Sequence, residues 1–83
     1  MQQIGKNLYF LRISNKTNKF YSQKDISELF HIPQTHISRF ENGKEIVRLL
    51  DIISYSIFFD VSTDDIIFKK YNSYTKEFEN IQR

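Results

Sequence analysis

The chain has 83 residues, 40% hydrophobic and 16% aromatic, so it holds a single domain with a small core. It contains no cysteine, which excludes disulfides, thiol chemistry and cysteine-based zinc sites, and its two histidines cannot form a structural zinc site unless carboxylates join them. Its net charge of +2 is only weakly basic and does not by itself indicate a partner.

The charges are unevenly distributed along the chain. Five basic residues precede the first acid, Asp25, whereas most acids come after residue 50. The N-terminal half is therefore expected to attract an anionic partner. No apolar run approaches the roughly 18 residues of a membrane span, and the first residues do not resemble a secretion signal. We expect a soluble, cytoplasmic protein with no membrane partner.

The first predicted helix runs from Ile4 to Ser14. Ile4, Leu8 and Leu11 recur at spacings of four and three, which places them on one helix face, while Gly5 weakens the start of the helix. Residues 15–21 then form a polar loop, and the aromatic side chains at its end, Phe20 and Tyr21, are expected to fix it to the core. The lysines of this loop, Lys16 and Lys19, either reach phosphates or are simply solvated.

The stretch from Ser22 to Lys44 is predicted to form two short helices joined by a tight turn. Ser22 is a good N-cap for the first of them, and Asp25 suits its first turn. Pro33 ends one helix and can begin the next, and Gly43 is the natural left-handed cap of the second. The expected inward-facing residues are Ile26, Leu29, Phe30 and Ile32 in the first half and Ile37 and Phe40 in the second.

The second of these helices presents polar side chains to solvent. Its predicted outer face holds Gln34, Thr35, Ser38 and Arg39, with Asn42 at its end, and it carries no acid. Side chains of these types can read base edges, because arginine pairs with guanine, glutamine pairs with adenine, and a threonine methyl meets the thymine methyl. The alternative is an ordinary solvated helix face.

Residues Glu45 to Phe59 are predicted to form the next helix. This is the most hydrophobic part of the chain, so it is expected to be the central core helix. Helical spacing is kept by Ile46, Leu49, Leu50, Ile53 and Ile57, and the apolar face is broadened by Ile52, Phe58 and Phe59. A turn follows, and then a last helix capped by Ser62 or Thr63 that ends at Phe68.

The tail, residues 69–83, allows two interpretations. Tyr71, Tyr74, Phe78 and Ile81 recur at spacings of three, four and three. The tail is therefore either a frayed end that packs on the domain or an extra amphipathic helix that pairs with a second subunit.

Residues 5–68 together resemble the lambda-repressor-like helix-turn-helix domain of phage repressors, Cro proteins and bacterial XRE-type regulators. The matching landmarks are Leu11-Arg12, Ser22-Gln23, Asp25-Ile26-Ser27, the run Ile37 to Lys44, and the run Val61 to Ile67. The resemblance implies an all-α domain of five helices over residues 1–68, followed by the tail as an extra C-terminal helix or dimer contact.

The resemblance also implies roles for single residues. It makes residues 34–42 the recognition helix in the major groove, with Gln34, Thr35 and Arg39 as base contacts and Ser38 as a weaker one. It places phosphate contacts at Gln23, Lys24, Asn42 and Lys44. It further implies a partly buried ion pair between Arg12 and Glu41, so Glu41 is interpreted as structural rather than as a base reader.

The chain departs from the family pattern at several positions. The turn that usually holds glycine has His31, which tolerates a positive φ at some cost, and Pro33 stands where a capping serine or threonine is usual. The loop of residues 15–21 is longer than in compact members, and the helix after Gly43 lacks the frequent proline near its start.

The predicted function is a sequence-specific, DNA-binding transcriptional regulator of phage or bacterial repressor type. Two copies are expected to bind a two-fold symmetric operator, because one such helix reads only a few base pairs. The sequence has no motif for an enzyme, a cofactor, a metal or a small-molecule ligand. The alternative is a protein-binding regulator such as an antitoxin or a repressor-sequestering module.

Overall fold

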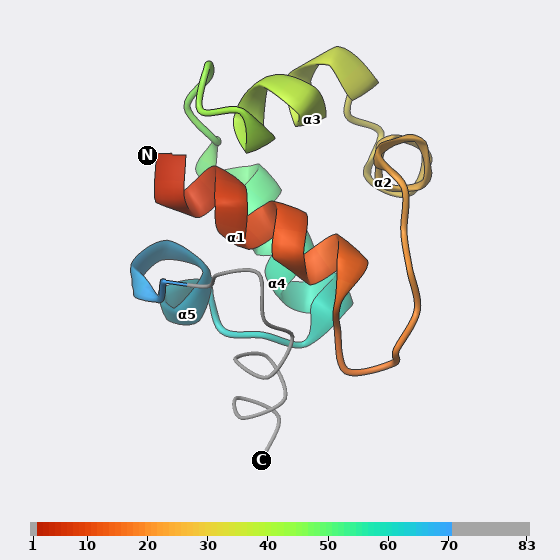
Figure 1. Cartoon of the computed structure of the whole chain (residues 1–83), viewed down its shortest axis with the longest axis vertical. Coiled ribbons are helices and arrows are strands. Elements are labelled where there is room, and N and C mark those ends of the chain that lie inside the picture. Colours follow the sequence, from red (N-terminus) through yellow and green to blue (C-terminus); the bar gives the residue numbers. More distant parts are fainter. Residues whose placement is uncertain (1, 71–83) are drawn as a thin grey trace.

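The computed structural model describes residues 2–70, and within that range the chain forms five α-helices, which confirms the predicted all-α fold. Figure 1 shows α1 crossing the middle of the molecule, with α3 above it, α5 below it and α4 behind it. The helices are α1 (Gln2–Ile13), α2 (Gln23–Phe30), α3 (Gln34–Glu41), α4 (Leu49–Phe59) and α5 (Thr63–Phe68). The two interpretations of the tail concern residues 69–83, of which residues 71–83 lie outside the described residues.

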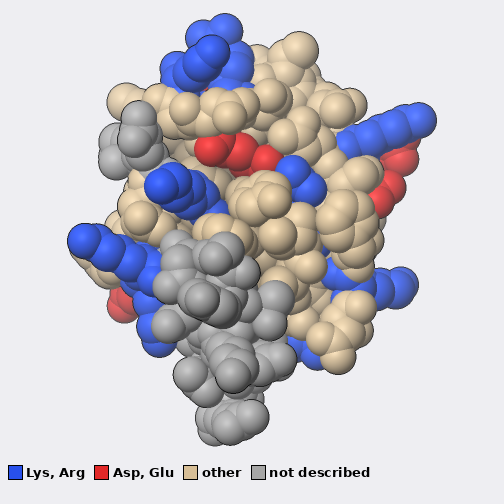
Figure 2. Space-filling view, viewed as in Figure 1, with Lys and Arg blue, Asp and Glu red and all other residues tan. Residues whose placement is uncertain are grey.

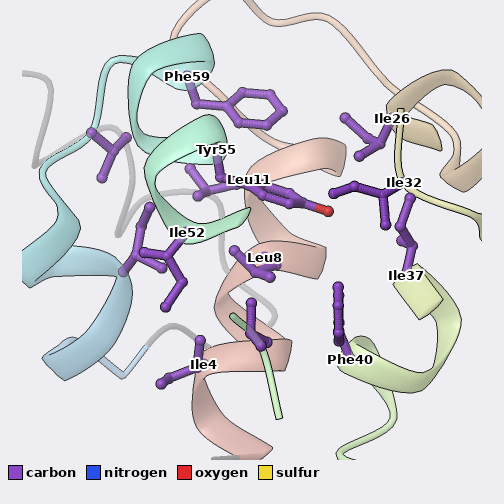
Figure 3. Packing of buried hydrophobic residues seen from close by; sticks show 13 residues of the cluster. Ile4, Leu8, Leu11, Ile26, Ile32, Ile37, Phe40, Ile52, Tyr55 and Phe59 are labelled. Carbon is purple, nitrogen blue, oxygen red and sulfur yellow. The ribbon is translucent and has the colours of Figure 1, made fainter. Parts of the chain in front are cut away.

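Helix α1, rather than α4, is the central element of the core. Leu8 and Leu11 are fully buried and lie between the side chains of α4 on one side and those of the α2–α3 unit on the other (Figure 3). The same helix also contacts α5. The expectation that the most hydrophobic segment forms the central helix is therefore wrong, because α4 buries only one of its faces.

Helix α4 begins at Leu49, four residues later than predicted. Arg48 has extended backbone angles (φ −75°, ψ 150°) and serves as the N-cap position, so residues before it cannot belong to the helix. The side chain of Val47 is buried at 4% exposure and fixes the preceding loop to the core. Ile46 fits the helical spacing of the following residues but lies in the loop before α4.

Several apolar residues that were expected in the core lie at the surface instead. The core face of α4 consists of Ile52, Tyr55 and Phe59, which recur at three and four, so it lies opposite the expected main stripe. Ile52 and Phe59 were expected only to broaden the apolar face, and Phe58, expected with them, is 41% exposed. Phe20, expected to fix the loop before α2, is 68% exposed. The other predicted core residues found exposed are Leu29, Ile46, Leu49, Leu50 and Ile57.

A close contact between α1 and the end of α3 depends on Gly5. A Cβ atom built on Gly5 would lie 1.8 Å from the carbonyl oxygen of Phe40 and 3.3 Å from the Cα of Glu41. Any side chain at this position would therefore push the two helices apart. Gly5 was predicted only to weaken the start of α1, whereas in the structure it sets the distance between α1 and α3.

Two buried asparagines, Asn7 and Asn15, hold neighbouring segments in place by donating hydrogen bonds to backbone carbonyls. The Nδ2 of Asn7, a fully buried residue of α1, donates to the carbonyl oxygens of Ile66 and Lys69, both at 2.7 Å. These bonds satisfy carbonyls at the end of α5 and join the last helix to the first. Asn15 performs a similar task in the loop after α1, where its Nδ2 donates to the carbonyl oxygen of Lys19 at 2.7 Å.

Candidate nucleic-acid interface

Local capping interactions define where α2 begins and ends. The hydroxyl of Ser22 accepts the backbone N–H of Asp25 at 3.0 Å, and the Asp25 carboxylate accepts the N–H of Ser22 at 2.9 Å, which forms a capping box. Helix α2 then ends at His31, which adopts the left-handed conformation expected of it (φ 57°, ψ 40°). As predicted, Pro33 gives α3 no side-chain cap.

Hydrogen bonds between Ser27 and Ile32 close the turn between the two helices. The Ser27 hydroxyl donates to the carbonyl oxygen of Ile32 at 2.6 Å, and the N–H of Ile32 donates to the carbonyl oxygen of Ser27 at 3.2 Å. Ile32 is buried at 3% exposure, so the turn is held both by hydrogen bonds and by packing. This arrangement fixes where α3 starts relative to α2.

Helix α3 buries one face and leaves the opposite face open. Ile37 and Phe40 are fully buried and point into the core (Figure 3), whereas Gln34, Thr35 and Arg39 are exposed. The helix ends at Glu41, one residue earlier than predicted, because Asn42 takes the C-cap position and Gly43 turns left-handed with φ 69°. In Figure 1 the helix forms one edge of the molecule, so its open face meets no other element.

The side chains of Ser38 and Asn42 are tied to each other. The Nδ2 of Asn42 donates to the carbonyl oxygen of Ser38 at 2.8 Å and approaches the Ser38 hydroxyl at 3.4 Å. Ser38 is half-buried, in contrast to the exposed side chains that precede it on the helix. Asn42 therefore satisfies the Ser38 carbonyl in the last turn of α3, while its own side chain stays exposed.

An ion pair between Arg12 and Glu41 locks α3 to α1. The Nε and Nη2 of Arg12 donate to the two carboxylate oxygens of Glu41 at 2.7 and 2.9 Å, and these side chains are only 9% and 6% exposed. Burial disfavours the charged guanidinium, but the hydrogen bond and the charge of Glu41 outweigh it, so the pKa of Arg12 is raised. The paired, forked geometry fixes the last turn of α3 in direction as well as position.

Gln23 belongs to the same network. Its Nε2 donates to Glu41 Oε1 at 3.0 Å, which joins the start of α2 to the end of α3. The two remaining candidate phosphate contacts, Lys24 and Lys44, are exposed. Figure 2 shows Lys and Arg side chains projecting at the top of the molecule, where Figure 1 places α3 and the loop after it. Lys16 instead forms an ion pair with Asp60, the residue directly after α4, with 2.9 Å between Nζ and Oδ2.

The sequence prediction missed Glu45, an acid placed directly beside the open face of α3. Its two carboxylate oxygens lie 2.6 Å from His36 Nδ1 and 3.1 Å from Arg39 Nε, so one side chain of the following loop holds two side chains of the helix. The signal in the sequence is an acid two residues after the Asn42-Gly43 helix end, close to a basic last turn. Arg39 nevertheless stays 59% exposed in its side chain.

The Glu45 contact leaves most of the Arg39 guanidinium available. The Nε of Arg39 forms an ion pair with Glu45 Oε1, and the arginine side chain stays 59% exposed. The terminal amino groups are the donors that a bidentate contact with guanine requires. Glu45 therefore lies beside Arg39 while most of the arginine side chain stays open to a partner.

Other kinds of site find no support in the described range, residues 2–70. No cluster of three or more histidine, cysteine, aspartate or glutamate side chains there is arranged to hold a metal ion. None of the helices in that range has the length and hydropathy to cross a bilayer.

The geometry of α2 and α3 defines a class of protein. Two short helices joined by a left-handed turn, the second with a buried apolar stripe and an open polar face, form the helix-turn-helix motif that places a helix in the major groove of DNA. The helix-turn-helix family profile matches residues 20–66, more than half of the chain. The chain belongs to this family, in its lambda-repressor-like, Cro/C1 type, and is a DNA-binding helix-turn-helix regulator. No curated protein and no solved structure shows a significant match.

Proposed function

We propose that this protein is a sequence-specific transcriptional regulator of repressor type that reads the major groove with α3 and acts in the cytoplasm of a bacterium or on behalf of a phage. The observation that carries the proposal is the open face of α3. Gln34, Thr35 and Arg39 are exposed there together, while the two nearby acids, Glu41 and Glu45, are turned into ion pairs. An anionic duplex therefore meets donors on this face rather than free carboxylates.

The proposed contacts divide into two groups. Gln34, Thr35 and Arg39 read base edges, with a smaller part for the half-buried Ser38. Lys24 and Lys44 bind phosphates from either side of α3, supported by Gln23 at the start of α2 and by Asn42 at the end of α3. The Gln23 amide has two N–H donors, and the bond to Glu41 leaves one of them for a phosphate.

Two copies are proposed to bind a two-fold symmetric operator. An eight-residue helix spans only a few base pairs, so a single domain has too few base contacts for selective binding in a genome. Two half-sites about one helical turn apart supply the missing affinity and specificity. A dimer on such a site represses by covering a promoter and needs no cofactor.

The substitution Arg39→Ala tests base reading by α3. We expect it to weaken binding to a selected site by about 1–3 kcal/mol while changing binding to random DNA much less, because a bidentate base contact discriminates between sequences. The measurement is fluorescence anisotropy with both duplexes at one fixed salt concentration.

Lys16→Ala is the matched control, because it removes the same charge from a side chain that pairs with Asp60 away from α3. Equal losses on selected and random DNA for Arg39→Ala would count against base reading. Absence of DNA binding in the unaltered protein would favour the protein-binding alternative, an antitoxin-like or repressor-sequestering module.

A further inference from the structure

One histidine of α3 lies at the side of the open face. His36 stands between the exposed Thr35 and the buried Ile37, and its side chain is 45% exposed. Helical geometry places it on the flank that it shares with Arg39, three positions further along the helix. Neither the base contacts nor the phosphate contacts proposed above include this residue.

The contact with Glu45 fixes which nitrogen of the imidazole carries a proton. Glu45 Oε2 lies 2.6 Å from His36 Nδ1. A carboxylate only accepts hydrogen bonds, so Nδ1 must be the nitrogen that donates. Nε2 is then a bare acceptor in the neutral ring and an N–H donor in the cation. Within residues 2–70, Nε2 has no hydrogen-bond partner of its own.

Glu45 also offsets the charge of a protonated His36. Its other oxygen, Oε1, lies 3.1 Å from Arg39 Nε, so the carboxylate stands between two basic side chains. The group of three carries no net charge while the imidazole is neutral, and one positive charge once it is protonated. Arg39 and the first turn of α3 both oppose this added charge, whereas the carboxylate in direct contact favours it.

Glu45 forms the only ion pair of His36 among residues 2–70. The imidazole ring otherwise lies near Phe40, with 6.3 Å between the ring centroids. Several charged residues that do not pair with the imidazole stand on the segments next to or packed against α3, namely Lys44 and Arg48 of the following loop, Lys6 and Arg12 of α1, and Lys24, Asp25 and Glu28 of α2. Arg12 is occupied by Glu41, and Arg48 is occupied by Asp51.

We propose that His36 is a proton-dependent phosphate contact, in which the protonated ring donates from Nδ1 to Glu45 and from Nε2 to a phosphate of the DNA backbone. This inference rests on the proposed function, because it takes α3 to lie in the major groove. A helix in the groove turns its outward side chains to the base edges, and its flanks face the sugar-phosphate strands. Loss of the proton turns Nε2 into an acceptor, which cannot bind a phosphate oxygen.

The proton and the DNA then bind together. Each domain that binds with a neutral His36 takes up one proton from solvent. Affinity is therefore highest below the pH range in which histidine titrates and is lost as the pH rises through that range. Linkage to one proton limits the change to about tenfold per pH unit. The contact carries no base information, so it acts on any DNA sequence.

Fluorescence anisotropy of the full chain with a random-sequence duplex, at fixed salt and from about pH 5.5 to about pH 8, tests the proposal. We expect the affinity of the unaltered protein to be about three- to tenfold higher at the acid end. His36→Gln should remove most of this difference, because glutamine stays neutral throughout.

His31→Asn is the matched control, because it removes the only other histidine of the chain. His31 has a left-handed backbone with φ 57°, which asparagine tolerates. This variant should keep the pH dependence of the unaltered protein.

Two further variants separate the roles of the two partners. His36→Lys keeps a positive charge at every pH in the range, so it should bind random DNA tightly and without the pH dependence. Glu45→Gln removes the charge that favours the proton, so it should reduce the difference in affinity between the acid and the alkaline end. Circular dichroism at both ends of the range checks that each variant keeps its helices.

Binding that does not change with pH would overturn the proposal, as would a pH dependence that His36→Gln leaves intact. Both results leave the proposed regulator standing. Absence of DNA binding at every pH would contradict the proposed function and this inference together. NMR spectroscopy of the histidine rings gives a readout without DNA, in which a neutral His36 protonated on Nε2 rather than Nδ1 would contradict the role of Glu45.

Discussion

The buried ion pair of Arg12 and Glu41 shows how one residue can matter for DNA binding without touching DNA. Glu41 stands on α3, but its carboxylate accepts from Arg12 and Gln23 and is turned away from the open face. A side chain so enclosed cannot reach a base without breaking three hydrogen bonds. Its effect on binding should therefore come through the position of α3.

Glu41→Ala is expected to destabilise the fold by about 3 kcal/mol, because it leaves the Arg12 charge buried without its partner. The measurement is the free energy of unfolding from urea denaturation, together with the thermal midpoint. Glu28→Ala, which removes an exposed acid of α2, should change stability by no more than about 0.5 kcal/mol. An unchanged thermal midpoint with lost DNA binding would refute the structural role of Glu41.

Glu45 acts at the open face itself. Its carboxylate contacts Arg39 and His36 and, with α3 docked as proposed, also brings a negative charge near the DNA backbone. The charge opposes binding through phosphates alone, while the held Arg39 favours binding through bases. Glu45 should therefore raise discrimination between DNA sequences at the expense of total affinity.

Glu45→Gln is expected to increase the affinity for random DNA several-fold and to lower the ratio of selected-site to random-site affinity. Parallel anisotropy titrations of both duplexes measure the two quantities. Asp60→Asn makes the same change in net charge at a residue that pairs with Lys16, so it shows the effect of charge alone. If both variants change the ratio equally, the position of Glu45 has no part in discrimination.

At the scale of elements, the distance between α1 and α3 depends on a residue without a side chain. Gly5→Ala places a methyl group within 1.8 Å of the Phe40 carbonyl oxygen, so the backbones must move apart. We expect a loss of about 1–3 kcal/mol in the free energy of unfolding, as for overpacked cores. Lys6→Ala, at the exposed neighbouring position of the same helix, is the control and should be nearly neutral. A Gly5→Ala variant as stable as the original would mean that α1 can shift without cost.

Short-range patterns in the sequence predicted the elements that short-range interactions control. The capping box joins Ser22 and Asp25, three positions apart, and the left-handed turns at His31 and Gly43 follow from local backbone preferences. The inward residues of α3, Ile37 and Phe40, were also predicted, because only one of its faces is apolar.

Features that depend on distant contacts could not be predicted in this way. Helix α4 has two apolar faces, so periodicity cannot show which one enters the core. The outer face was predicted as the main stripe, and two of the buried residues, Ile52 and Phe59, were predicted only to broaden it. The role of Gly5 depends on a contact 35 positions away along the chain, with Phe40. The Glu45 bridge depends on how a loop folds back against a helix. The base and phosphate contacts assigned to α2 and α3 stay predictions.

At the scale of the whole molecule, the domain has two open surfaces of different character. One is polar and belongs to α3, and the other is apolar and belongs to α4. The weak net charge of +2 then matters less than where the basic side chains lie.

The most direct test of sequence-specific reading by α3 is DNA binding by the intact protein as a function of salt, after selection from a random-sequence pool. We predict that selection yields a palindromic site with half-sites about one helical turn apart, and that affinity for it falls steeply as salt rises, because phosphate contacts release counterions. Weak binding with no selected sequence, or none at all, would contradict the account and favour a protein as the partner of this domain.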